Sequence, residues 1–160
     1  MNQPPNLQQA ILSAMQTEKD AMDFYRLVAE KMSDPQAAER FSQLAREERQ
    51  HAHTFFHAYR GGDIHSFEEF LATPPRVDSE WWKALRQLEA QGFTERSALH
   101  LAIERERSLE KELRYTADTI NRPEVKAIFL ANASSTHNHC RSIALAYAEK
   151  YSQVATCCER

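Results

Sequence analysis

Residues 44–51 read LAREERQH. Glu48 and His51 are three positions apart in this stretch, so in a helix their side chains project from the same face. The apolar positions that continue this face are Phe41, Leu44, Phe55 and Tyr59. Apolar residues at three- and four-residue spacing are typical of the buried stripe of an amphipathic helix. This stripe is interrupted near its middle by a carboxylate and an imidazole.

Three other stretches show the same spacing, and we predict four helices in all. Their bounds are about 7–32, 35–60, 95–119 and 123–151. The second helix has the clearest limits, because Asp34-Pro35 is a cap followed by a proline at the first helical position. Gly61-Gly62 ends it.

Residues 61–94 form a connection that is much longer than two antiparallel neighbours require. Ser66 and Ser79 each begin a short helical pattern within this connection, and the second pattern ends near Gly92. The sequence therefore predicts an all-α fold. In that fold two helical hairpins form a four-helix bundle, joined by a long crossover that contains short helices.

Polar residues interrupt every predicted stripe. The first and third helices carry Glu18 and Glu106 on their inward faces. The predicted inward positions of the fourth helix are Ala127, Leu130, Ser134, His137, Arg141, Ala144, Leu145 and Ala148. The histidines predicted to point away from the bundle are His53, His57, His100 and His139.

The two predicted hairpins bring these polar residues to one height. Residues 44–51 align with residues 130–137, and Glu18 aligns with Glu106. The separations are 51 − 18 = 33 residues in one half and 137 − 106 = 31 residues in the other. We therefore expect Glu18, Glu48, His51, Glu106 and His137 to meet in one layer.

Buried carboxylates need compensation, because an uncompensated buried charge costs several kcal/mol. A divalent cation bound by glutamate oxygens and histidine nitrogens would supply it. Mixed oxygen and nitrogen ligands suit iron, manganese or zinc better than calcium or magnesium. The constellation predicts a metal site, although any one of these glutamates alone would be an ordinary solvated helix residue.

Composition limits the other possibilities. The chain has 160 residues, 42% of them hydrophobic and only 3 of them glycine, which fits a single domain over 1–160. A formal charge of −3 without a basic patch argues against a nucleic-acid surface. The sequence shows neither a signal peptide nor a membrane span, so we expect a cytoplasmic protein.

The stretch EKDAMDFY at residues 18–25, followed by LAREERQH at 44–51, resembles the first half-site of rubrerythrins and related ferritin-like proteins. The resemblance implies a ferritin-like bundle with two iron ions that react with dioxygen or hydrogen peroxide. It also implies terminal carboxylates at Glu18 and Glu106, a bridging carboxylate at Glu48, and nitrogen ligands at His51 and His137.

The chain departs from the family pattern at Ser134, where the family has a second bridging glutamate. Three alternatives follow: Glu110 joins the site, water or an anion bridges the metals, or the site holds one metal, with zinc or manganese as alternatives to iron. The chain also lacks the paired Cys-x-x-Cys motifs of a rubredoxin domain, so any electrons must come from a separate donor. Ferritin-like bundles commonly pair, which predicts a homodimer.

Three functional interpretations remain at this point. The first is a rubrerythrin-like diiron oxidase or peroxidase, in which Tyr25 hydrogen-bonds a ligand, acts as a redox relay, or is an ordinary core tyrosine. The second is a non-redox iron or zinc binding or storage protein with a degenerate site. The third is a structural bundle with a vestigial site.

Overall fold

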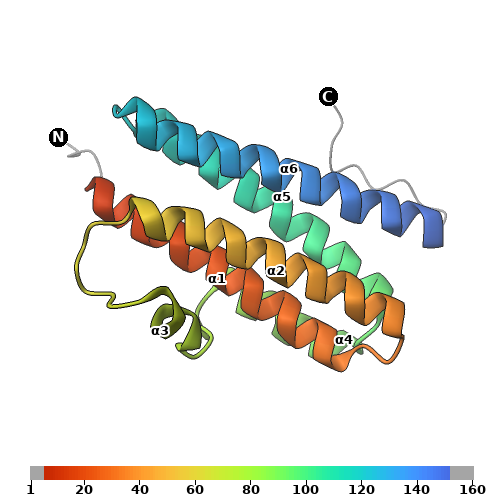
Figure 1. The fold of residues 1–160 in the computed structure, drawn as a ribbon. Helices are drawn as coiled ribbons and strands as arrows, with labels where there is room; N and C mark the ends of the chain where they lie inside the picture. The colour runs from red at the N-terminus through yellow and green to blue at the C-terminus, as the bar shows by residue number, and fades with distance from the viewer. Residues whose placement is uncertain (1–5, 152–160) are drawn as a thin grey trace.

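The computed structural model describes residues 6–151, and its elements are six helices in that range. The four long helices are α1 (Leu7–Lys31), α2 (Pro35–Ala58), α5 (Glu95–Thr119) and α6 (Pro123–Tyr151). Their ends differ from the predicted ends by at most two residues. Helix α1 pairs with α2 and α5 pairs with α6, which gives the two predicted hairpins of a ferritin-like bundle (Figure 1).

Side-chain caps set the helix starts that the sequence predicted. Asp34 accepts a hydrogen bond from the backbone N–H of Ala37 at the start of α2, and Pro35 occupies the first helical position. Thr94 caps α5 in the same way through the N–H of Ser97.

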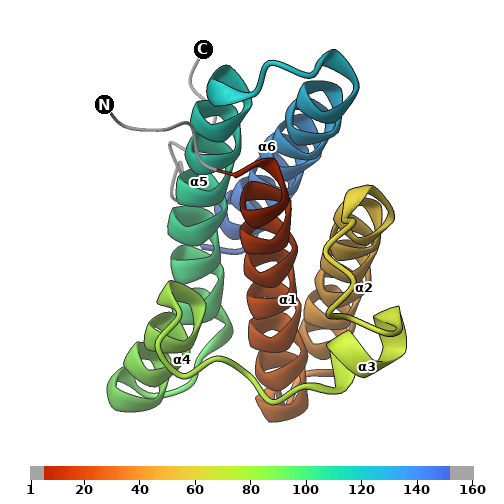
Figure 2. The ribbon, with the colours of Figure 1, turned by 90° about the vertical axis from the view of Figure 1, so that its left-hand side faces the viewer.

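The crossover contains the two predicted short helices, α3 (Phe67–Ala72) and α4 (Glu80–Gln91), capped by Ser66 and Ser79. Helix α4 ends at Gly92, whose φ of 86° favours glycine. Figure 2 shows α4 beside α1 and α5, whereas α3 lies by α2. The crossover therefore packs against both hairpins.

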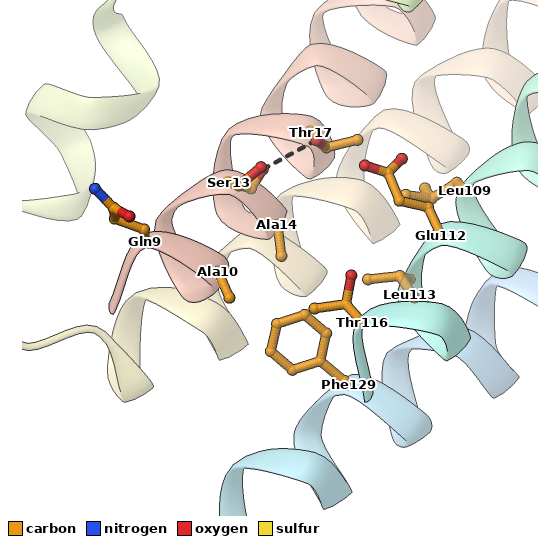
Figure 3. A pocket seen from close by; sticks show the side chains of 10 residues that line it. All are labelled: Gln9, Ala10, Ser13, Ala14, Thr17, Leu109, Glu112, Leu113, Thr116 and Phe129. Atoms are coloured by element: carbon orange, nitrogen blue, oxygen red, sulfur yellow. Dashed lines mark hydrogen bonds between the residues drawn. The ribbon is translucent and has the colours of Figure 1, made fainter. Parts of the chain in front are cut away.

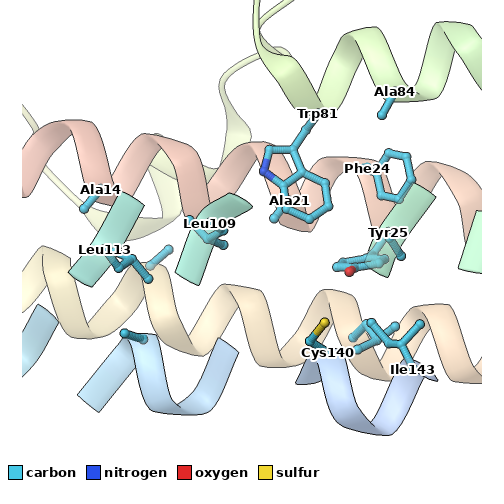
Figure 4. Close-up of a cluster of buried hydrophobic side chains, with 14 of the residues drawn as sticks. Ala14, Ala21, Phe24, Tyr25, Trp81, Ala84, Leu109, Leu113, Cys140 and Ile143 are labelled. Atoms are coloured by element: carbon cyan, nitrogen blue, oxygen red, sulfur yellow. The ribbon is translucent and has the colours of Figure 1, made fainter. Parts of the chain in front are cut away.

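Two contacts hold the crossover on α1. Trp81 is 4% exposed, and its ring lies 5.4 Å from that of Phe24 and 5.6 Å from that of Tyr25 (Figure 4). Arg76 donates hydrogen bonds of 2.5 Å and 3.1 Å to the two carboxylate oxygens of Asp20. The residues of α1 near Glu18 are consequently buried on every side of the helix.

The predicted inward face of α6 is wrong at most positions, and of the predicted residues only Ala144 is buried. Its buried residues are Val125, Phe129, Asn132, Ala133, Thr136, Cys140, Ile143, Ala144, Ala146 and Tyr147. Ala127, Ser134 and Arg141 are exposed, as are Leu130 at 37% and Leu145 at 61%. These two leucines suggested the wrong stripe, because α6 carries apolar and small residues around much of its circumference.

No helix among the described residues is long and apolar enough to cross a membrane.

Candidate metal centre

Three glutamates from three helices meet in the middle of the bundle. Glu18 of α1, Glu48 of α2 and Glu106 of α5 are each 0% exposed. All three occupy the inward positions that the sequence predicted for their helices. The contacts below confirm that the three side chains lie at one depth in the bundle. Buried carboxylates of this number are rare unless paired or bound to metal.

Two histidines lie against this group of glutamates. His51 Nδ1 lies 3.2 Å from Glu48 Oε2 and 3.6 Å from Glu18 Oε2. His139 Nδ1 lies 3.2 Å from Glu48 Oε1 and 4.0 Å from Glu106 Oε1. The two imidazole rings stack with centroids 4.9 Å apart and planes 12° apart. Glu48 is therefore central, with one histidine and one further glutamate on each side.

The expectation that His139 is a surface residue is wrong. Its side chain is 12% exposed, and one atom each from Glu48, His51 and His139 lie within 4.8 Å of one another, a spacing suited to a metal ion. His137 lies elsewhere: its Nδ1 is 3.1 Å from Glu110 Oε2, and its side chain is 32% exposed. The structure does not bring His137 together with the buried glutamates.

The other candidate residues also lie outside this layer. Glu110 accepts a hydrogen bond of 3.0 Å from Arg114 in addition to its contact with His137. Ser134 is exposed, so it does not occupy the place of a second bridging carboxylate. Thr136 precedes His139 by the three residues that separate Glu48 from His51, is fully buried and donates a hydrogen bond of 2.9 Å to the carbonyl of Asn132.

A signal for His139 was present in the sequence. The separation 139 − 106 = 33 equals 51 − 18 = 33, whereas the separation used for His137 is 31. In addition, Thr136 and His139 repeat the three-residue spacing of Glu48 and His51. The exact match of the separations was a better guide than the apolar stripe of α6.

Tyr25 provides a direct contact to the layer. Its hydroxyl donates a hydrogen bond of 2.6 Å to Glu106 Oε1, and the residue is 0% exposed. Burial raises the pKa of Tyr25 well above its ordinary value, and the nearby Glu106 carboxylate adds to the effect. Of the three interpretations of this tyrosine, the hydrogen bond to a candidate ligand is confirmed, and the ring also packs in the apolar core.

The pKa of Glu48 is shifted in the opposite direction from the pKa values of Glu18 and Glu106. Burial raises the pKa of Glu18 and of Glu106 well above the ordinary value, and the charge of Glu48 adds to both shifts. Burial acts on Glu48 in the same direction, but hydrogen bonds from His139 and His51 outweigh it and lower its pKa. Burial opposes protonation of His51, but the nearby Glu18 carboxylate and the hydrogen bond to Glu48 raise its pKa to about 10.

Several carboxylate oxygens in this layer lack a compensating group. Within residues 6–151, both oxygens of Glu18 and Oε2 of Glu106 are buried and have no hydrogen-bond partner. Buried acceptors of this kind cost free energy unless a proton or a cation meets them. Oxygen donors beside two imidazole nitrogens are a donor set that fits iron, manganese or zinc.

A model of the rubrerythrin family matches residues 6–126, which is 121 of the 160 residues. The chain belongs to the rubrerythrin family. The match includes Glu18, Glu48, His51 and Glu106 and ends before Thr136 and His139. No curated protein and no solved structure matches the chain. The family membership and the Glu48, His51 and His139 group together indicate a carboxylate-histidine metal protein.

Proposed function

We propose that this rubrerythrin-family protein holds two iron ions in the carboxylate-histidine layer and reacts with dioxygen or hydrogen peroxide. One observation carries the proposal above all others. Glu18, Glu48 and Glu106 are fully buried, and three oxygens of Glu18 and Glu106 have no hydrogen-bond partner. Bound cations are the simplest compensation for this concentration of negative charge.

The proposed ligands follow the contacts. Glu18 and His51 would serve one ion and Glu106 and His139 the other, with Glu48 between them. His139 takes the role that the sequence had suggested for His137. Iron bound here would supply electrons and open coordination positions for a small oxidant.

Tyr25 would keep the layer ordered during the reaction. Its hydroxyl proton is held 2.6 Å from Glu106 Oε1, and the raised pKa of the phenol keeps that proton in place at neutral pH. A fixed hydrogen bond orients the carboxylate and leaves its other oxygen directed toward the layer.

A cavity of about 250 Å³ between α1 and α5 offers a route for a small oxidant (Figure 3). Leu109 lines the cavity one helical turn after Glu106, and Thr17 lines it directly before Glu18. Its walls are mainly apolar, with Ala14, Leu113 and Phe129 among them. Such a lining suits a small uncharged oxidant, and Glu112 is the one acidic residue among the cavity's lining residues.

Two partners belong to the same proposal. No Cys-x-x-Cys motif occurs in these 160 residues, so we propose a separate electron donor. Homodimer formation is proposed by analogy with ferritin-like bundles.

The test is anaerobic loading with Fe(II), followed by iron analysis and addition of hydrogen peroxide. We expect about two iron ions per chain and the appearance of ferric absorbance in wild type. The Glu48→Ala variant should lose both the bound iron and the ferric absorbance. A fully loaded wild-type protein that shows no absorbance change with peroxide or dioxygen would exclude the redox function.

One observation favours a second candidate, a non-redox protein that binds or stores iron or zinc. The residue three positions before His139 is Thr136, which offers no bridging carboxylate, and its hydroxyl is hydrogen-bonded to the backbone. Stoichiometric zinc in the purified protein, together with no peroxide reactivity after iron loading, would support this candidate.

A further inference from the structure

Glu47 lies on the opposite side of His139 from the buried glutamates. Its Oε2 is 2.8 Å from His139 Nε2, whereas His139 Nδ1 is 3.2 Å from Glu48 Oε1. The imidazole therefore spans two consecutive glutamates of α2. The side chain of Glu47 is 39% exposed at the rim, and that of Glu48 is fully buried.

This arrangement offers a neutral His139 two carboxylates for its one ring proton. An ionised carboxylate only accepts hydrogen bonds, so without metal either Nδ1 donates to Glu48 or Nε2 donates to Glu47. A cation among the oxygens of Glu48 and Glu106 requires the lone pair of Nδ1. With the cation bound, the proton of His139 therefore lies on Nε2, toward Glu47.

The carboxylate of Glu47 is itself held in place. Gln43 Nε2 donates a hydrogen bond of 3.2 Å to Glu47 Oε1, which leaves Oε2 for His139. The ring of His139 in turn stacks on that of His51. Fixing one imidazole therefore helps to fix the other.

Charge gives Glu47 a second role. The three buried glutamates carry three negative charges, against four positive charges on two divalent ions, and α6 offers Thr136 in place of a fourth carboxylate. Glu47 adds a fourth negative charge, which contacts His139 and not the buried glutamates themselves. A carboxylate hydrogen-bonded to a ligating histidine increases the donor strength of that histidine.

We propose that Glu47 is a positioning residue for His139: it accepts the Nε2 proton and presents Nδ1 as the metal ligand between Glu48 and Glu106. The inference rests on the proposed metal site. It assigns Glu47 a role that differs from that of Glu48, although the two are neighbours in sequence.

The test compares wild type with Glu47→Ala, Glu47→Gln and the control Glu39→Gln, using Zn(II) as the probe. Glu39 is on the same helix and pairs with Arg46 at 2.7 Å, so its variant also removes one charge and one ion pair. Competition against a chelator at pH 7 should show zinc bound about 10- to 100-fold more weakly by Glu47→Ala. Glu47→Gln should show a smaller loss, because the amide oxygen still accepts a hydrogen bond. Glu39→Gln should stay within about twofold of wild type.

Nitrogen-15 NMR of the histidine rings provides a readout that a purely structural role would not change. Zinc-loaded wild type should carry the His139 proton on Nε2, protected from exchange, and Glu47→Ala should lose that protection. Adding Glu47→Ala to His139→Ala should weaken zinc binding little beyond His139→Ala alone, because Glu47 acts through that ring.

Two outcomes would overturn the inference, and they differ from each other. If wild type binds zinc tightly and Glu47→Ala binds it equally well, only the role of Glu47 is wrong. If wild type binds neither zinc nor iron, the proposed function fails as well. Circular dichroism of each metal-free variant shows whether the fold is intact.

Discussion

At the scale of single residues, the surroundings of the buried layer favour the ionised form of Glu48 and the protonated form of Glu18 and Glu106. Glu48 is stabilised as a carboxylate by hydrogen bonds from His139 and His51. Glu18 and Glu106 have no comparable donors on the oxygens that face the layer. In the metal-free protein, burial favours the protonated form of these two side chains, and in the metal-bound protein cations would compensate their charge.

The stability of the metal-free protein should therefore fall as pH rises above the ordinary pKa of glutamate. Between the ordinary glutamate pKa and the raised pKa of Glu18 and Glu106, the folded state binds more protons than the unfolded state. The free energy of unfolding then decreases with pH. His51, with its pKa raised to about 10, acts in the same direction above the ordinary histidine pKa.

Urea unfolding of the metal-free protein at several pH values measures this slope. Glu18→Gln should reduce it and Glu39→Gln should leave it unchanged. A stability that rises across this pH range in wild type would show that Glu18 and Glu106 ionise normally.

Tyr25 allows a second test at this scale. Tyr25→Phe removes the donor to a fully buried carboxylate oxygen, so we expect it to cost roughly 1–3 kcal/mol of unfolding free energy in the metal-free protein. Tyr59→Phe is the matched control, because the Tyr59 hydroxyl donates to the exposed Asp63 at 2.6 Å. The control should change stability by less than about 0.5 kcal/mol. Equal effects in the two variants would exclude a special role for the Tyr25 hydrogen bond.

At the scale of the helices, α1, α2 and α5 were predictable and the register of α6 was not. The stripes of the first three combine large apolar residues with an obvious polar interruption, which is Glu18 in α1, Glu106 in α5 and the pair Glu48 and His51 in α2. Helix α6 buries small residues such as Ala133 and Thr136 and exposes Leu145, so apolar spacing does not fix its rotation. The burial of Thr136 and His139 depends on contacts with α2 and α5, which no local pattern contains.

The register of α6 makes a clear prediction. His139→Ala should weaken metal binding at least 10-fold, because it removes a proposed ligand. His137→Ala should stay within about threefold of wild type, since that residue contacts Glu110 outside the layer. Isothermal titration with Zn(II) measures both. The opposite order of effects would restore the ligand role first suggested for His137.

At the scale of the whole molecule, the division into two hairpins and a crossover was predictable from lengths and caps. The 34-residue connection was too long for a simple turn, and Ser66 and Ser79 marked its short helices. The attachment of the crossover to α1 was less predictable, because the Arg76–Asp20 ion pair joins residues 56 positions apart.

Metal loading should stabilise the whole bundle. A ligand at 100 times its Kd adds about 2.7 kcal/mol to the free energy of unfolding. For a chain of this size we expect a rise of roughly 5–11 °C in Tm, measured by calorimetry on chelator-treated and zinc-loaded protein. A variant with Glu18→Gln, Glu48→Gln and Glu106→Gln should show no rise. Identical melting with and without zinc in wild type would favour a vestigial site.

The most direct measurement is anomalous diffraction at the iron edge, on crystals of the iron-loaded protein. The proposed site predicts two peaks in the layer, one between Glu18, Glu48 and His51 and the other between Glu106, Glu48 and His139. If solution analysis shows bound iron and the crystals show no anomalous peak among these buried glutamates, cations do not compensate their charge and the central claim is wrong.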